Sequence, residues 1–144
     1  MVGEERVVEL LKRVPLFSGL TDRQLKSLVS MIIERPCAAG EIIVPQDEEG
    51  LGFFMIAAGA AEAVRLRADG SSSVVNTFGP GDYFGELALL DKGPRTASVV
   101  AIEETDCLIL PRVNFLHLMR REGDIGVEIM IELAKRFRSA LEAY

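Results

Sequence analysis

Residues 80–98 read PGDYFGELALLDKGPRTAS, a stretch that places a glycine before an acid, one apolar turn, a Gly93-Pro94 break and then Arg95. Gly85 permits a sharp turn, and the helix-forming residues after it predict a short helix whose first N–H groups lack intrahelical acceptors. Free amides at a helix start attract anions, and the planar guanidinium of an arginine suits two phosphate oxygens. The stretch therefore predicts a small anion site, with Arg95 returning on the next strand.

The charges of this stretch limit the kind of anion. It offers one arginine, no lysine at a Walker-type position and no Asp/Asn cluster for magnesium, which favours a monoanionic phosphodiester over a di- or triphosphate. Glu86 would repel phosphate, so we expect it to accept a hydrogen bond from a ribose hydroxyl. Thr96 adds a hydroxyl that can reach the phosphate or a base edge. The alternative is an ordinary ion pair between Glu86 and Arg95, and the spacing leaves both interpretations open.

The length, charge and composition of the chain limit the classes of protein to which it can belong. The 144 residues suffice for one domain with its own core, and the net charge of −6 disfavours nucleic-acid binding by this chain alone. No apolar run approaches the roughly 20 residues of a membrane span, and the start MVGEER does not resemble a signal peptide. We expect a cytoplasmic protein in which Cys37 and Cys107 are reduced thiols.

The central part of the chain has the sequence pattern of a β protein. From about Ile33 to Leu110, short apolar runs alternate with glycine-containing turn signals at intervals of roughly 8–12 residues, which favours a sandwich or small barrel. The tract RADGSS, residues 67–72, predicts a hairpin between two of these strands.

Helices are predicted before the strands. Apolar residues recur at amphipathic intervals over residues 4–14, and Pro15 ends this helix. Thr21 is predicted to cap a second helix, with Gln24 at the reciprocal position of a capping box.

Helices are also predicted after the strands. Residues 112–122 predict a short helix, Gly123 interrupts it, and Asp124 is predicted to cap a longer helix that reaches about Ala143. An apolar stripe recurs every four residues along this helix, at Ile125, Ile129, Leu133, Phe137 and Leu141. The stripe can pack against the barrel or pair with a second subunit.

The stretch GDYFGELALLDKGPRTASV closely resembles the phosphate-binding cassette of cyclic-nucleotide-binding domains, the family of bacterial catabolite activators, kinase regulatory subunits and gated channels. VPLFSGLTDRQLKSLV resembles the leading helices of that family, and AAGEIIVPQDEEGLGFFMIAAGAAEA resembles its early strands. The resemblance implies a mainly β fold, an eight-stranded jelly-roll (double-stranded β-helix) barrel with N-terminal helices and C-terminal lid helices. It divides this single domain into helices over 1–32, a barrel over 33–111 with the cassette at 81–98, and helices over 112–144.

The resemblance also implies roles for individual residues toward cyclic AMP or cyclic GMP, with no further cofactor. Main-chain amides, and space for the ligand beside the backbone, would come from Gly85, Glu86, Leu87 and Ala88. Glu86 would hold the ribose 2′-hydroxyl, Arg95 the cyclic phosphate, and Thr96 and Ala97 would supply a hydroxyl and a further amide. The residues expected near the base are Phe84, Val75, Asn76 and Arg136.

The sequence departs from the family pattern at two places. Ala60, Ala61 and Ala63 stand where relatives usually carry bulkier β-branched residues. The polar base contact of the activator proteins falls near Ala140 and Leu141, which cannot donate to adenine. Apolar residues or Arg136 would then cover the base, and the preference between cyclic AMP and cyclic GMP stays open.

The leading hypothesis is a regulatory sensor that binds a cyclic mononucleotide and signals by repositioning its C-terminal helices toward an effector protein or domain. The alternatives are a non-binding relative that acts as an interaction or dimerisation domain, and the sensory half of a longer transcription regulator or channel. A homodimer through the C-terminal helix is compatible with each of them. An enzyme is not expected, because a single histidine, His117, supports neither a cupin-type metal site nor a triad.

Overall fold

A computed structural model describes residues 2–91 and 93–143, which form two units. The β unit comprises Ile32–Val113. The helical unit combines the chain up to Met31 with the chain from Asn114 onward.

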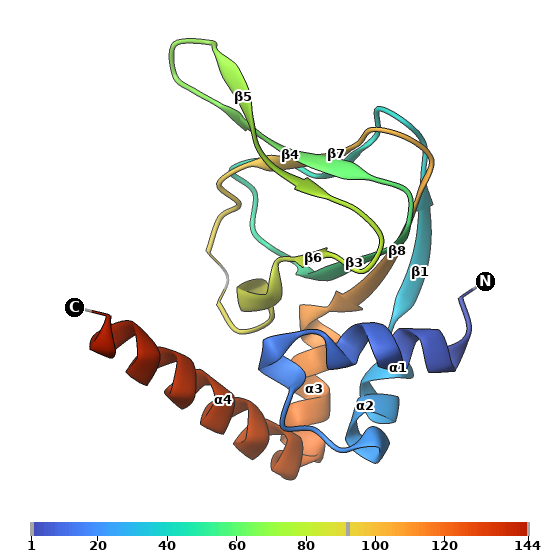
Figure 1. Ribbon diagram of the computed structural model, residues 1–144, viewed down its shortest axis with the longest axis vertical. Helices are drawn as coiled ribbons and strands as arrows, with labels where there is room; N and C mark the ends of the chain where they lie inside the picture. The colour runs from blue at the N-terminus through green and yellow to red at the C-terminus, as the bar shows by residue number, and fades with distance from the viewer. Residues whose placement is uncertain (1, 92, 144) are drawn as a thin grey trace. The chain divides into compact units, whose positions relative to one another are not determined.

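The described part of the β unit holds eight strands in two antiparallel sheets, which confirms the mainly β prediction (Figure 1). The order in the first sheet is β1 (Ile33–Cys37), β8 (Thr105–Pro111), β3 (Gly52–Ala58) and β6 (Tyr83–Phe84). The order in the second sheet is β2 (Ile42–Val44), β7 (Ser98–Ala101), β4 (Ala61–Leu66) and β5 (Ser72–Phe78).

The core of the β unit contains inward-facing residues of both sheets. Its buried members are Cys37, Ile43, Val44, Phe54, Ile56, Ala61, Ala63, Phe84, Val99, Ala101 and Cys107. Because side chains alternate between the faces of a strand, Ala61 and Ala63 at the start of β4 both face this core. Two of the three short side chains noted in the sequence therefore belong to the core of the β unit, and Ala60 does not.

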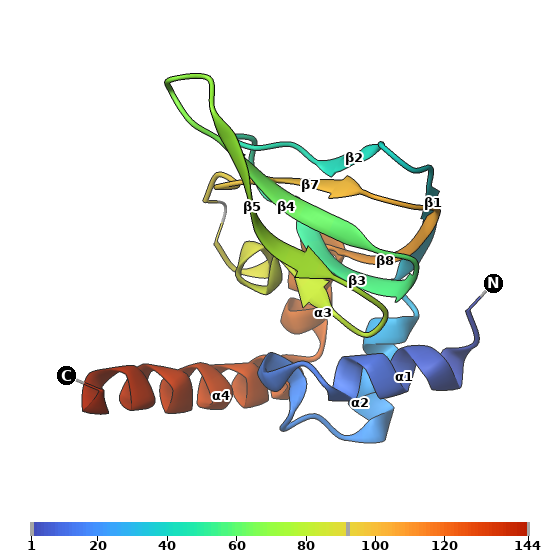
Figure 2. The same cartoon turned by 45° about the horizontal axis from the view of Figure 1, so that its top comes forward.

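The predicted hairpin is confirmed. β4 pairs with β5 from Ala61 opposite Phe78 to Leu66 opposite Ser72, and Gly70 adopts a left-handed φ of 87° in the connecting turn. The carboxylate of Asp69 accepts hydrogen bonds from the amide and the hydroxyl of Ser71, at 2.9 and 2.6 Å. Figure 2 shows the tip of this hairpin projecting beyond the rest of its sheet.

The helical unit contains α1 (Glu4–Lys12), the short 3₁₀ helix η1 (Pro15–Phe17), α2 (Asp22–Val29) and α4 (Gly123–Glu142), together with most of α3 (Arg112–Arg121). The capping box of α2 is present as predicted. The Gln24 amide donates to Thr21 Oγ1 at 3.2 Å, and the Thr21 amide donates to Gln24 Oε1 at 2.9 Å.

The start of α4 differs from the prediction. Glu122 occupies the N-cap position, and Asp124 lies inside the first turn instead of capping it. The Asp124 carboxylate accepts a hydrogen bond of 3.0 Å from Gln24 Nε2, so it joins α4 to α2. A contact between two helices, which local sequence cannot reveal, thus determines its role.

The apolar stripe of α4 lies in two environments. Ile125 and Ile129 are buried within the helical unit, whereas Phe137 is 66% exposed and Leu141 is 57% exposed. In the described residues, no helix combines the length and apolarity that a membrane crossing requires.

Candidate functional site

A pocket of about 420 Å³ opens on the β unit between two arms of the chain, residues 85–91 and residues 93–96. Its lining residues are Gly85, Glu86, Leu87, Ala88, Asp91, Gly93, Pro94, Arg95 and Thr96. The structure therefore brings six of the predicted site residues to one pocket, from both arms of the stretch.

Gly85 makes the turn that opens the first arm. It follows β6 with a φ of 80°, the left-handed region that glycine enters without strain. Residues Glu86–Leu89 then form a single 3₁₀ turn, η2, in which the Ala88 amide donates to the Gly85 carbonyl at 3.0 Å. The amides that begin such a turn have no acceptor within it, so this arm provides N–H groups for an anion.

Arg95 lies on the second arm, but not on a strand as predicted. β7 begins only at Ser98. The Arg95 segment, residues 94–96, pairs instead with the acidic loop of residues 47–49. The Arg95 amide donates to the Glu48 carbonyl at 2.9 Å, and the Asp47 amide donates to the Arg95 carbonyl at 2.7 Å. Pro94 has no N–H group to donate to a regular ladder, which accounts for the isolated bridge with Glu49 at this point.

The Arg95 side chain is half-buried and is held by uncharged groups. Nη2 donates to the Gly52 carbonyl at 3.0 Å, and Cζ lies 5.6 Å from the ring centroid of Phe54 and 5.9 Å from that of Phe84. Burial lowers the pKa of the guanidinium, which nonetheless stays charged because an arginine is not deprotonated in proteins. Arg95 forms no ion pair with any residue of 2–91 or 93–143, so the pair with Glu86 that the spacing allowed is not formed.

Glycines make room for this arginine. A Cβ atom at Gly85 would lie 2.6 Å from Arg95 Nη1 and 2.8 Å from Nη2. A Cβ atom at Gly50 would lie 2.6 Å from the Cβ of Ala88 and 3.4 Å from Arg95 Nε. Gly50 and Gly52 were not predicted as site residues. The sequence feature that could have revealed them is the Gly-Leu-Gly run of residues 50–52, directly after the acidic residues 47–49.

Four other predicted residues of the β unit do not line the pocket. Ala97 is half-buried against the core, and Phe84 lies inside it. Val75 is 46% exposed on β5, and the neighbouring Asn76 accepts a hydrogen bond of 2.9 Å from the Thr77 amide through its side chain. Arg136, the remaining predicted residue, lies on α4 in the helical unit.

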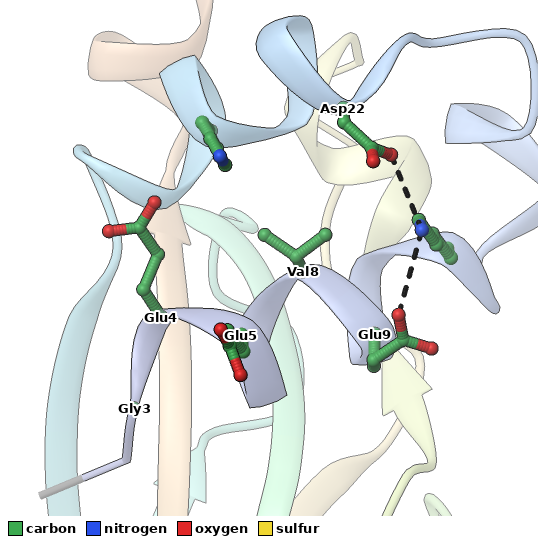
Figure 3. Close-up of a pocket in the computed structure, with 8 residues that line it drawn as sticks. Gly3, Glu4, Glu5, Val8, Glu9 and Asp22 are labelled. Atoms are coloured by element: carbon green, nitrogen blue, oxygen red, sulfur yellow. Dashed lines mark ion pairs between the residues drawn. The ribbon is translucent and has the colours of Figure 1, made fainter.

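A larger groove, of about 750 Å³, lies between α1 and α2 (Figure 3). Four acidic residues and two lysines line it, and Lys12 Nζ lies 3.5 Å from a Glu9 oxygen and 3.3 Å from an Asp22 oxygen. Because the acidic residues outnumber the lysines and the ion pairs of Lys12 are exposed, this groove suits an anion less well than the smaller pocket that Arg95 lines. Size alone therefore does not identify the site. The described residues also contain no cluster of His, Cys, Asp or Glu able to hold a metal ion.

Comparison with known proteins places this geometry in a family. Residues 34–122 match the profile of the cyclic nucleotide-binding domain. The cyclic AMP receptor protein of Thermus thermophilus is 35% identical over 130 residues, which cover 90% of this chain and 60% of that protein.

Two solved structures are similar as well. The N-terminal domain of a transcriptional regulator from Streptomyces coelicolor superposes with a TM-score of 0.86 at 28% identity, covering 93% of this chain and 96% of that one. The regulatory domain of Toxoplasma gondii PKA, crystallised with cAMP, gives a TM-score of 0.74 at 30% identity, covering 79% of this chain and 43% of that one. The chain belongs to the cyclic nucleotide-binding domain family.

Proposed function

We propose that the chain binds one cyclic mononucleotide at the pocket that Gly85, Glu86 and Arg95 line, and acts as a regulatory sensor. The observation that carries this proposal is a half-buried guanidinium without an ion-pair partner in the described chain, lining one pocket with the start of η2. A single arginine balances the single negative charge of a cyclic phosphodiester.

Within the pocket, Arg95 and the amides of the η2 turn would hold the phosphate. The half-buried Glu86 would accept a hydrogen bond from the ribose 2′-hydroxyl, and Thr96 would add a hydroxyl. Ala97, which follows Thr96 and does not itself line the pocket, would add its main-chain amide. Cyclic AMP is the first ligand to test, since the Thermus and Toxoplasma proteins are named for it or bound to it. Cyclic GMP is the competing ligand, and Val75, Asn76 and Arg136 are the residues proposed to choose between them.

The test is a calorimetric titration of the chain and of Arg95→Ala with both nucleotides. Removing the guanidinium leaves the phosphate without its charge partner, so we expect about a 100-fold loss of affinity. Arg67→Ala is the matched control, because Arg67 is an exposed arginine of the β4–β5 turn that bonds Ser73 and does not line the pocket. Near-normal binding by Arg95→Ala would contradict the role given to this residue.

The proposed output is a movement of the C-terminal helices. A ligand shifts an equilibrium between two arrangements only if it binds one of them better, and closing apolar helix residues over a base would supply that difference. Exposed apolar residues on α4 support this proposal. Hydrogen exchange with and without nucleotide should show altered protection within residues 112–143; protection that changes only in the β unit would contradict it.

A second candidate is an interaction or dimerisation domain, which exposed apolar residues of α4 favour: Val127, Met130, Ile131, Phe137 and Leu141. Burying such a stripe against a second copy would remove it from water. Sedimentation at micromolar concentration should then show a dimer that Phe137→Glu converts to a monomer. The chain spans 60% of the length of the Thermus relative, so attachment to a further domain is also a proposal.

A further inference from the structure

Two phenylalanines form a stacked pair beneath Arg95. Phe54 of β3 and Phe84 of β6 are direct partners in the strand register, and their rings stack with centroids 5.1 Å apart and planes 5° from parallel. Both side chains are at least 90% buried, and neither lines the pocket. Strand pairing therefore fixes a rigid aromatic surface, which we call the aromatic platform.

The platform supports a cation. The guanidinium carbon of Arg95 lies within 6 Å of both ring centroids, the range in which a ring face attracts a positive charge. The guanidinium also donates a hydrogen bond to the Gly52 carbonyl. The charge is thus stabilised by two ring faces and a carbonyl, all of them uncharged.

This arrangement has a consequence for anion binding. A carboxylate could also stabilise a half-buried arginine, but an arriving phosphate would then have to displace it. Ring faces and a carbonyl hold the side chain without neutralising it, so its charge remains available to a ligand.

We propose that the aromatic platform of Phe54 and Phe84 is a positioning device that holds the Arg95 guanidinium oriented toward the pocket before any anion arrives. The effect that the platform has on nucleotide affinity rests on the proposed function. The structural part of the proposal, the orientation of Arg95 by the rings, concerns the ligand-free protein and is measurable without a nucleotide.

The first experiment measures the NMR chemical shift of the Arg95 Nε–Hε proton in the ligand-free 144-residue chain. The resonance is assigned by its disappearance in Arg95→Ala. Ring currents should shift this proton upfield in the unmodified chain. Phe54→Leu should move it downfield, whereas Phe54→Tyr, which keeps the ring, should restore the shift. Phe84→Leu is a second removal variant if Phe54→Leu does not fold.

The matched control is Phe78→Leu. The Phe78 ring contacts Phe84 at 5.1 Å between centroids but makes no cation–π contact with Arg95, so this variant loosens the aromatic cluster and leaves both rings of the platform beside the guanidinium. It should leave the Arg95 resonance nearly unchanged.

The second experiment is the affinity for cyclic AMP. We expect Phe54→Leu to weaken binding roughly threefold to tenfold, the size of a partly desolvated cation–π contact, and Phe78→Leu to weaken it less than about twofold. Two results would overturn the proposal. One is an Arg95 resonance that does not differ between Phe54→Leu and the unmodified chain, and the other is an equal loss of affinity in Phe54→Leu and Phe78→Leu. If neither the unmodified chain nor any variant binds a cyclic nucleotide, the proposed function fails, while the resonance still decides on the platform.

Discussion

Gly85 shows at the scale of one residue how closely the site is built. Its φ of 80° is unfavourable for any residue with a Cβ, and a Cβ there would also meet the Arg95 guanidinium and the Gly52 carbonyl at 2.6 to 2.9 Å. The two effects can be separated, because Gly70 has a similar φ of 87° and a Cβ atom there would meet no other atom within 4 Å.

Gly85→Ala should destabilise the protein by about 2–4 kcal/mol, since strain and a clash add, whereas Gly70→Ala should cost about 1 kcal/mol for strain alone. Urea unfolding of both variants measures the difference. Equal losses would show that the contact with Arg95 has no energetic weight.

Glu86 gives a second prediction at this scale, which rests on the proposed function. If its carboxylate accepts a hydrogen bond from the 2′-hydroxyl, Glu86→Gln should weaken cyclic AMP binding about tenfold, the loss of a hydrogen bond to a charged group. The matched ligand is 2′-deoxy cyclic AMP, to which the variant and the unmodified chain should bind with similar affinity. A variant that weakens both ligands equally would assign Glu86 a different role.

At the scale of elements, the capping box of α2 makes a local prediction. Thr21→Ala removes the acceptor for the Gln24 amide and should cost about 1 kcal/mol in urea unfolding, whereas Thr21→Ser keeps a hydroxyl and should cost much less. If Thr21→Ser costs as much as Thr21→Ala, the hydroxyl is not the stabilising group.

The pairing of β1 with β8 makes a prediction about pH. Burial, and then a hydrogen bond with the Glu34 carboxyl, raise the pKa of Asp106 from 3.8 to about 6. A raised pKa means that the folded state binds the proton more tightly than the unfolded state. The contribution of Asp106 to stability is therefore most favourable below about pH 4 and is lost as the pH rises to about 6.

Asp106→Asn removes this titration. Relative to the unmodified chain, the variant should gain stability between about pH 4.5 and about pH 7.5, by about 1 kcal/mol once solvent screening is allowed for. Urea midpoints at the two pH values test it, with Asp69→Asn in the exposed β4–β5 turn as the control. The control should lack this gain, because hydrogen bonds from Ser71 lower the pKa of Asp69. A constant difference between Asp106→Asn and the unmodified chain across this range would contradict the assignment.

At the scale of the whole molecule, ligand binding should appear as stability. A nucleotide that binds only the folded chain should stabilise it by about 2.7 kcal/mol at about 100 times its dissociation constant. Thermal unfolding with cyclic AMP and with cyclic GMP would rank the two ligands, and Arg95→Ala should lose most of the shift. An interaction domain that does not bind nucleotide should show no shift with either.

The sequence alone determined those features that depend on neighbouring residues. The helix start at Thr21, the hairpin at residues 67–72 and the glycine–acid–arginine spacing of the pocket all rest on local backbone preferences and short-range hydrogen bonds. For that reason the grouping of Gly85, Glu86 and Arg95 into one site could be predicted from a short window of residues.

Only the tertiary structure decided how that site is supported and where some of its predicted members lie. Gly50, Gly52 and Phe54 precede Arg95 by about 40 residues and meet it only because β3 pairs with β6 and the acidic loop pairs with the Arg95 segment. The contact of Asp124 with Gln24 spans 100 positions and has no local signature. Long-range contacts of this kind arise from strand and loop pairing within the β unit and from helix packing within the helical unit, which no short window of sequence encodes.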